Sequence, residues 1–160
     1  VFVMDIIGLN KTQVTAASTV PEFLVGTVGR YDRTGNLYKY VKYNGGAGSV
    51  AAVAGNFVYN YAPSGASAGA TTEVTSDVTD SGGIGMGALQ AVIATGGYGW
   101  LQVTGTATLN LALTAGADGN ALTAIGTTDG ALDVSAAVTD YICATAVDAS
   151  AKIVFLTCPL

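Results

Sequence analysis

The sequence predicts an all-β protein, a compact barrel- or sandwich-like domain of short antiparallel strands with an extended N-terminal arm. Val, Thr, Tyr and Ile dominate short segments in which apolar and polar residues alternate, as they do along half-buried strands. Gly, Asn or Asp interrupts these segments about every eight to twelve residues, which is typical of all-β domains. The 160 residues are about the length of one domain. We therefore divide the chain into an arm, residues 1–23, and a single β domain, residues 24–160.

The composition excludes several classes of function. The chain has no histidine, which excludes catalytic and metal sites that need an imidazole. Six basic and eleven acidic residues give a net charge of −5, the wrong sign for binding nucleic-acid phosphates. No apolar run approaches the roughly 20 residues that a membrane-spanning helix needs. We therefore expect a protein that is not an enzyme, with no cofactor, no metal, no nucleic acid and no membrane as partner.

The clearest element is a β-hairpin whose strands span residues 24–31 and 37–43. The connection between them carries Gly35, which supplies the positive φ that tight turns need. Successive side chains point to opposite faces of a strand. On the second strand, one face therefore holds Tyr38, Tyr40 and Lys42, and the other holds Leu37, Lys39, Val41 and Tyr43.

Short strands separated by glycine-rich turns are predicted for the rest of the chain. A turn over 44–48 follows the hairpin, and Gly, Ser and Ala dominate the clearest loop, residues 62–72. Gly85 and Gly87 favour a strand over a helix for the apolar segment around them. The further strands are expected over residues 50–61, 73–80, 84–94, 96–105, 106–113, 121–127, 139–147 and 152–159.

The only tryptophan lies in the most distinctive of these strands. Trp100 and Tyr98 are two residues apart, so their side chains share one face. We expect the pair in the core, with an interface role as the alternative.

Candidate catalytic groups are sparse. The two pairs of neighbouring carboxylates, Asp77 with Asp80 and Asp129 with Asp133, lie in predicted turns. Asp side chains in turns usually accept hydrogen bonds from the backbone, and we expect that role here.

Tyrosines form a second candidate site, because six of the eight lie between residues 31 and 61. Tyrosines that alternate on a hairpin more often cover a barrel or a subunit interface than bind sugars. Tyr38 and Tyr40 are therefore candidate interface residues, and a glycan platform is the alternative.

The two cysteines lie on the two strands of the last predicted hairpin. Cys143 and Cys158 are about equally far from its turn near residue 150, so antiparallel pairing could bring them close enough for a disulfide. The alternative is a pair of reduced, buried side chains, the form favoured in a cytoplasm.

The arm and the charges suggest surfaces for partners. The arm is apolar and weakly patterned, and we expect it to reach neighbouring subunits. Five of the six basic residues precede residue 43, which predicts that this end faces an acidic partner, unless the few charges are scattered by accident. The candidate interface residues of these two kinds are Phe2, Met4, Ile6, Ile7 and Phe23 in the arm, and Arg30, Arg33, Lys39 and Lys42 among the cations.

The order of motifs resembles that of the small capsid decoration (cement) proteins of tailed bacteriophages. The resemblance covers roughly residues 21–160. A strand with Leu-Val-Gly-Thr precedes a turn with Asp and Gly, then a strand with Tyr-Lys-Tyr-Val-Lys, a Tyr-Gly-Trp-Leu-Gln segment and an Asp-Gly-Asn-Ala-Leu stretch. The matching positions are 25–27, 32–36, 38–42, 98–105 and 118–122.

The resemblance implies a compact β domain, usually trimeric, that binds the outside of the phage head and stabilises the lattice of the major capsid protein without catalysis. The protein would then belong to the outer surface of the virion, with the major capsid protein and its own copies as partners. One alternative is a head fibre or a surface adhesin that binds glycans through the tyrosines. Another is a subunit of a different β assembly, such as a tail tube or a surface layer.

Overall fold

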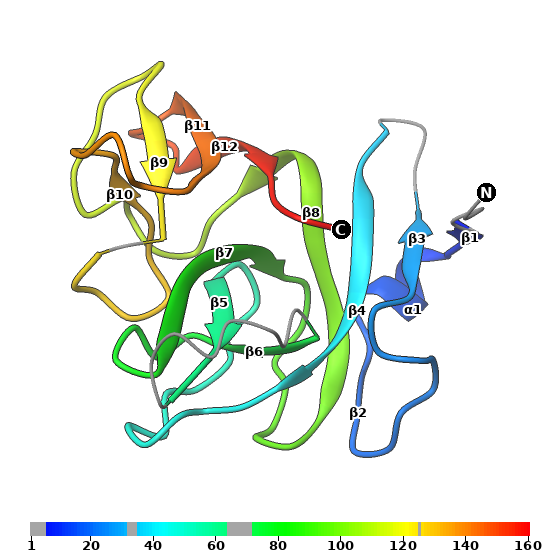
Figure 1. Cartoon of the computed structure of the whole chain (residues 1–160). Coiled ribbons are helices and arrows are strands. Elements are labelled where there is room, and N and C mark those ends of the chain that lie inside the picture. Colours follow the sequence, from blue (N-terminus) through cyan, green and yellow to red (C-terminus); the bar gives the residue numbers. More distant parts are fainter. Residues whose placement is uncertain (1–5, 32–34, 64–71, 125) are drawn as a thin grey trace.

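The computed structural model describes residues 6–31, 35–63, 72–124 and 126–160 (Figure 1). Of the described residues, 41% lie in strands and 3% in helix, which confirms the all-β prediction. The elements in chain order are β1 (Ile7–Gly8), α1 (Lys11–Val14), β2 (Ala17–Ser18), β3 (Val28–Arg30), β4 (Leu37–Tyr43), β5 (Phe57–Tyr61), β6 (Glu73–Thr75), β7 (Ser81–Leu89), β8 (Tyr98–Thr108), β9 (Ala121–Thr123), β10 (Asp133–Val134), β11 (Ile142–Asp148) and β12 (Ile153–Thr157).

Five strands close into a barrel. β4 pairs with both β8 and β6, and β5 and β7 complete the ring between them, as the cyan and green strands of Figure 1 show. The β4–β6 pair is parallel, whereas the other four pairs of the ring are antiparallel. β3 forms the predicted hairpin with β4, with Gly29 opposite Tyr38. The strand predicted over residues 24–31 is shorter than expected, because residues 24–27 belong to the loop before β3.

β8 connects the barrel to a second group of strands. Its first half pairs with β4 and β7, and its second half pairs with β12, which continues through β11 and β9 to β10. The sequence predicts two strands here, divided near Gly105. Gly105 instead lies inside one strand with a φ of 93°, and a Cβ atom at that position would overlap the side chain of Asn36. A glycine at such a close approach continues the strand because it has no side chain to displace.

Buried side chains form two clusters, on the two faces of β4. The larger cluster fills the barrel and continues under β11 and β12; it includes Val41 and Tyr43 from β4, with Leu37 packed against it. The smaller cluster contains Tyr38 and Tyr40. The alternation predicted for this strand is therefore confirmed.

The described part of the predicted arm, residues 6–23, lies against the β domain. β1 pairs with β3 in parallel, and β2 pairs with the start of β8. Between them, Asn10 and Gln13 form a capping box on the single turn of α1, with both hydrogen bonds at 2.9 Å. Leu9 and Val14 are buried in the smaller cluster. The aromatic side chains on the outer face of β4 and β8 would be exposed to water without this segment, whose apolar side chains pack over them.

The strand predicted over residues 50–61 is shorter than expected. Residues 53–56 form a turn, closed by the hydrogen bond from the amide of Asn56 to the carbonyl of Val53, with Gly55 at a φ of 84°. The strand β5 begins only after this turn. Among the described residues, no helix is long and apolar enough to cross a membrane.

Candidate functional site

The smaller cluster is built from aromatic rings on the outer face of β4 and β8. The ring centroid of Phe23 lies 5.3 Å from that of Tyr40 and 5.2 Å from that of Trp100, both in edge-on contact. Tyr98 stacks on Tyr40 at 6.2 Å. The hydroxyl of Tyr40 accepts a hydrogen bond from the backbone N–H of Glu22 at 3.2 Å, and burial raises the pKa of Tyr40. These contacts fix the chain between β2 and β3 against the barrel.

This cluster buries side chains that the sequence assigns to a surface. Tyr38 is 4% exposed and Tyr40 is 2% exposed, so neither presents its ring to a partner in the isolated chain. The reason is the cover supplied by residues 6–23, which the hairpin pattern does not reveal. Trp100 is 1% exposed and lies in the same cluster. Tyr43 and Tyr59 are buried in the larger cluster, so these two rings are not available to the glycan platform that the sequence left as the alternative.

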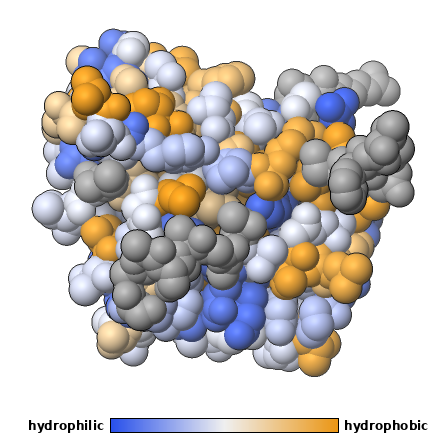
Figure 2. All heavy atoms as spheres, viewed as in Figure 1, coloured by the Kyte–Doolittle hydropathy of each residue, from blue (hydrophilic) through white to orange (hydrophobic). Residues whose placement is uncertain are grey.

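An apolar surface lies beside the aromatic cluster, on the loop between β2 and β3. Val20, Leu24 and Val25 are 65%, 85% and 41% exposed, and we call these three residues the apolar rim. An open pocket next to the rim is lined by residues 21–25 and Tyr98. Figure 2 shows hydrophobic side chains gathered at the lower right, over this loop. The rim is one of the described surfaces that place exposed apolar side chains close together in the chain.

The arm residues predicted to contact neighbours have different environments. Phe2 and Met4 lie outside the described residues. Ile6 is 45% exposed, whereas Ile7 and Phe23 are partly buried against the aromatic cluster. Among the described residues of this region, the exposed apolar side chains are therefore Ile6 and the three on the loop between β2 and β3.

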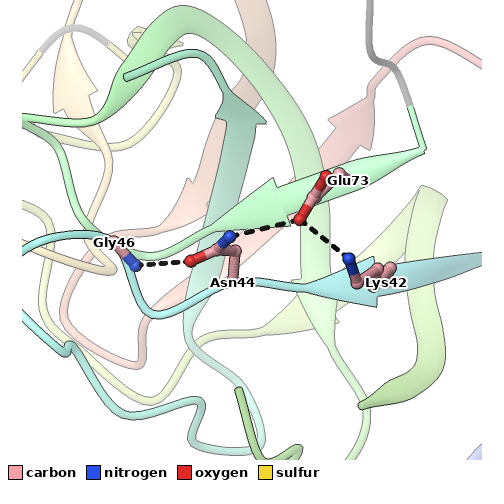
Figure 3. Close-up of polar contacts among 4 residues, drawn as sticks. All are labelled: Lys42, Asn44, Gly46 and Glu73. Carbon is pink, nitrogen blue, oxygen red and sulfur yellow. Dashed lines mark hydrogen bonds and ion pairs between the residues drawn. The ribbon is translucent and has the colours of Figure 1, made fainter. Parts of the chain in front are cut away.

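The three described cations among the four predicted to face an acidic partner do not form one surface. Arg33 lies outside the described residues, and Arg30 is exposed on β3. Lys42 is paired within the chain, because its Nζ lies 3.3 Å from Oε1 of Glu73 (Figure 3). The same carboxylate accepts a hydrogen bond from Asn44 at 3.2 Å.

Lys39 is the exception among the charged residues. It lies between Leu37 and Val41 on the face of β4 that is turned to the larger cluster, and it is 2% exposed. Its Nζ has no hydrogen-bond partner in the structure described here, and burial lowers its pKa. Lys39 and Lys42 thus point to opposite faces of one strand, which excludes a shared basic patch.

The first pair of candidate carboxylates, Asp77 and Asp80, accepts hydrogen bonds from backbone amides. Asp77 accepts hydrogen bonds from the amides of Gly48 at 3.0 Å and Thr79 at 2.9 Å, and Asp80 accepts one from Ala47. These bonds attach the loop after β4 to the turn before β7. The turn-capping prediction for this pair is confirmed.

The second pair of carboxylates has the same role. Asp129 accepts from the amide of Val78 at 2.9 Å, and Asp133 accepts from that of Val134 at 2.7 Å. Among the described residues, no group of three or more His, Cys, Asp or Glu side chains is placed to hold a metal ion.

The two cysteines are neighbours, and both are free thiols. Cys143 and Cys158 are buried in the larger cluster, and Sγ of Cys158 lies 3.5 Å from the carbonyl oxygen of Cys143. The adjacent Cys143 thiol and burial raise the pKa of Cys158, which keeps it protonated. Of the two alternatives left open by the sequence, a disulfide or two reduced and buried side chains, the structure has the second.

A second surface was not anticipated from the sequence. Thr106 and Thr108 of β8, Thr145 and Val147 of β11, and Phe155 and Thr157 of β12 are all exposed on one side of three paired strands. We call these six residues the neutral face. Its signal in the sequence was the lack of charge over residues 142–147 and 153–157.

Comparison with protein-family models, curated proteins and solved structures finds no match. The composition of the described surfaces is therefore the guide to function. Two of these surfaces, the apolar rim and the neutral face, consist of uncharged side chains that a partner could cover.

Proposed function

We propose that the chain is a capsid decoration protein of a tailed bacteriophage. In this role it is a structural component of the virion that binds the outer surface of the head, joins subunits of the major capsid protein and performs no catalysis. The resemblance in motif order supplies the class, and the all-β fold is compatible with it. The observation that carries the proposal is the apolar rim, where Leu24 is 85% exposed beside two exposed valines.

The rim supports binding to a large partner because exposed apolar clusters are unfavourable in water. Covering one leucine side chain contributes about 1.5–3 kcal/mol. This is too little for a tight one-to-one complex, but a protein that also contacts its own copies gains from the repetition of the contact over a shell. A decoration protein therefore needs only a few such side chains for each copy.

The test is binding to heads assembled from the major capsid protein encoded in the same genome. We expect the wild-type chain to bind these heads to saturation and to raise the temperature at which they rupture. Leu24→Asp should reduce the number of bound copies at least about tenfold, because it places a charge in a contact that excludes water. Bound copies can be counted by cryo-electron microscopy and by gel densitometry of purified heads.

Val92→Asp is the matched control. Val92 is 69% exposed on the loop between β7 and β8, outside the rim, so the same change of charge should leave head binding unchanged. Failure of the wild-type chain to bind heads would overturn the proposal. Equal binding by Leu24→Asp and Val92→Asp would instead remove the rim from the contact.

A further inference from the structure

The neutral face is a regular side of three antiparallel strands. Phe155 of β12 lies directly opposite Thr106 of β8 and Thr145 of β11, so it occupies the centre of the face. Along each strand, exposed residues alternate with buried ones such as Ala107, Ala146 and Val154. This alternation, clearest in β12, is typical of a strand in a sheet that packs one face on the core. The exposed face is thus held rigidly by the larger cluster beneath it.

The face carries no charge. β8 and β12 contain no charged residue, and the only one in β11 is Asp148 at its end. Asp148 accepts hydrogen bonds from the Ser150 hydroxyl at 2.7 Å and the Ala151 amide at 2.9 Å. Lys152, in the same turn, donates to the carbonyl of Asn110 at 2.8 Å. Both charges at this end of the hairpin are therefore engaged by their own chain.

The composition is that of an interface core, not of an ordinary solvated sheet. Solvated sheet faces usually carry charged side chains, whereas the centre of an interface is depleted of charge and enriched in aromatic residues. Here a phenylalanine that is 47% exposed lies between threonines on both neighbouring strands. Threonine hydroxyls can hydrogen-bond to one another across a contact without a formal charge.

We propose that the neutral face is the contact through which copies of this chain bind one another. The net charge of the chain favours a second copy as the partner over a protein of opposite charge. Two copies carry the same net charge of −5 and repel, so their contact must lie where neither places a charge. A partner of opposite charge would be selected by charged groups instead. The exposed cation Arg30 lies on β3, near the other end of the strand order and on the right of Figure 1, away from β11 and β12.

This inference rests on the proposed function only in expecting an oligomer, and its test needs no phage head. The mass of the purified chain is measured by analytical ultracentrifugation over a range of concentrations. We expect the wild-type chain to form a defined oligomer. Phe155→Asp should weaken self-association at least about tenfold, because each contact would then bury an unpaired carboxylate.

Two further variants make the result specific. Thr106→Lys places a charge on the neighbouring strand and should also yield monomers, whereas Val92→Asp changes an exposed valine outside the face and should leave the oligomer intact. Far-ultraviolet circular dichroism and thermal unfolding establish that each variant is folded. A wild-type chain that stays monomeric at all concentrations, or an oligomer that tolerates both charges on the face, would overturn the inference.

Head binding separates this inference from the proposed function. A folded, monomeric Phe155→Asp chain that binds heads more weakly but measurably supports both. A wild-type oligomer that fails to bind heads supports the self-contact and removes the decoration role. Head binding by a chain that never self-associates keeps the decoration role and removes the self-contact.

Discussion

Lys39 is a charged residue that does not contribute to the surface of the protein, because its side chain is buried. Alternation along β4 places it with Leu37 and Val41 over the larger cluster, and its ammonium has no hydrogen-bond partner in the described structure. An unpaired charge that is withdrawn from water destabilises the folded state. Lys39 and Lys42 were both predicted to be interface residues because of their charge, although the same alternation places them on opposite faces of β4. For such residues the face of the strand decides the role, and the sign of the charge does not.

Replacing Lys39 by methionine should therefore stabilise the protein. The substitution keeps the length of the side chain and removes the charge, so we expect the free energy of unfolding to rise by about 1 kcal/mol or more at pH 7. Lys42→Met is the control on the opposite face of β4. It breaks a partly exposed ion pair and should change the stability by no more than about 1 kcal/mol, in the destabilising direction. Urea unfolding measures both, and a less stable Lys39→Met chain would contradict the argument.

The advantage of Lys39→Met should also depend on pH. The pKa of Lys39 is lowered in the folded state, so between that value and 10.5 the unfolded chain binds more protons than the folded chain. The stability of the wild-type chain then gains with rising pH relative to the variant. The difference between the two is largest below the folded pKa and shrinks as the pH approaches 10.5. The buried tyrosines, whose pKa values are raised, titrate in both chains and cancel in the comparison.

At the scale of elements, the N-terminal segment is the part that local patterns describe least well. β1 and β2 have two residues each, too few for any periodicity, and each is defined only by its pairing with β3 or β8. The parallel β4–β6 pair that closes the barrel likewise has no local signal. By contrast, the hairpin at 24–43 and the last hairpin were predictable because residues in their longest strands alternate between core and surface. Local patterns do not indicate which distant segment packs over the aromatic side chains on the outer face of the barrel.

A substitution in that segment tests whether it belongs to the folded domain. Leu9 packs into the space left by Gly29, where a Cβ atom would lie 2.5 Å from its Cδ1, and it is 8% exposed. Leu9→Ala should cost about 2 kcal/mol of stability, at the low end for a buried leucine because the site is at the edge of a small cluster. Trp100, the only tryptophan, lies in the same cluster, so its emission should shift to longer wavelengths.

Ile6→Ala serves as the control, because Ile6 is 45% exposed and its truncation should cost less than about 0.5 kcal/mol. If the two variants unfold at the same denaturant concentration with unchanged Trp100 emission, residues 6–14 do not contribute to the fold. The segment would then be a free arm, as the apolar composition alone suggested.

At the scale of the whole molecule, the neutral face is separated from charged side chains, whereas Glu22 lines the pocket beside the apolar rim. The chain has a net charge of −5, yet its apolar rim and its neutral face hold no charged side chain, and most described charges bind their own backbone or each other. Net charge then acts on association only at long range, as a repulsion between copies. Contact through an uncharged face would leave the short-range attraction insensitive to salt.

The salt dependence of self-association follows from this separation. Raising the ionic strength from about 0.01 M to about 0.1 M shortens the screening length from about 30 Å to about 10 Å. The repulsion between copies then weakens, while a contact made by Phe155 and the threonines beside it loses nothing. We therefore expect the dissociation constant of the oligomer to fall as salt is added, measured by sedimentation at several ionic strengths. An interface held by ion pairs would show the opposite trend, so an oligomer that dissociates in salt would exclude the neutral face as its contact.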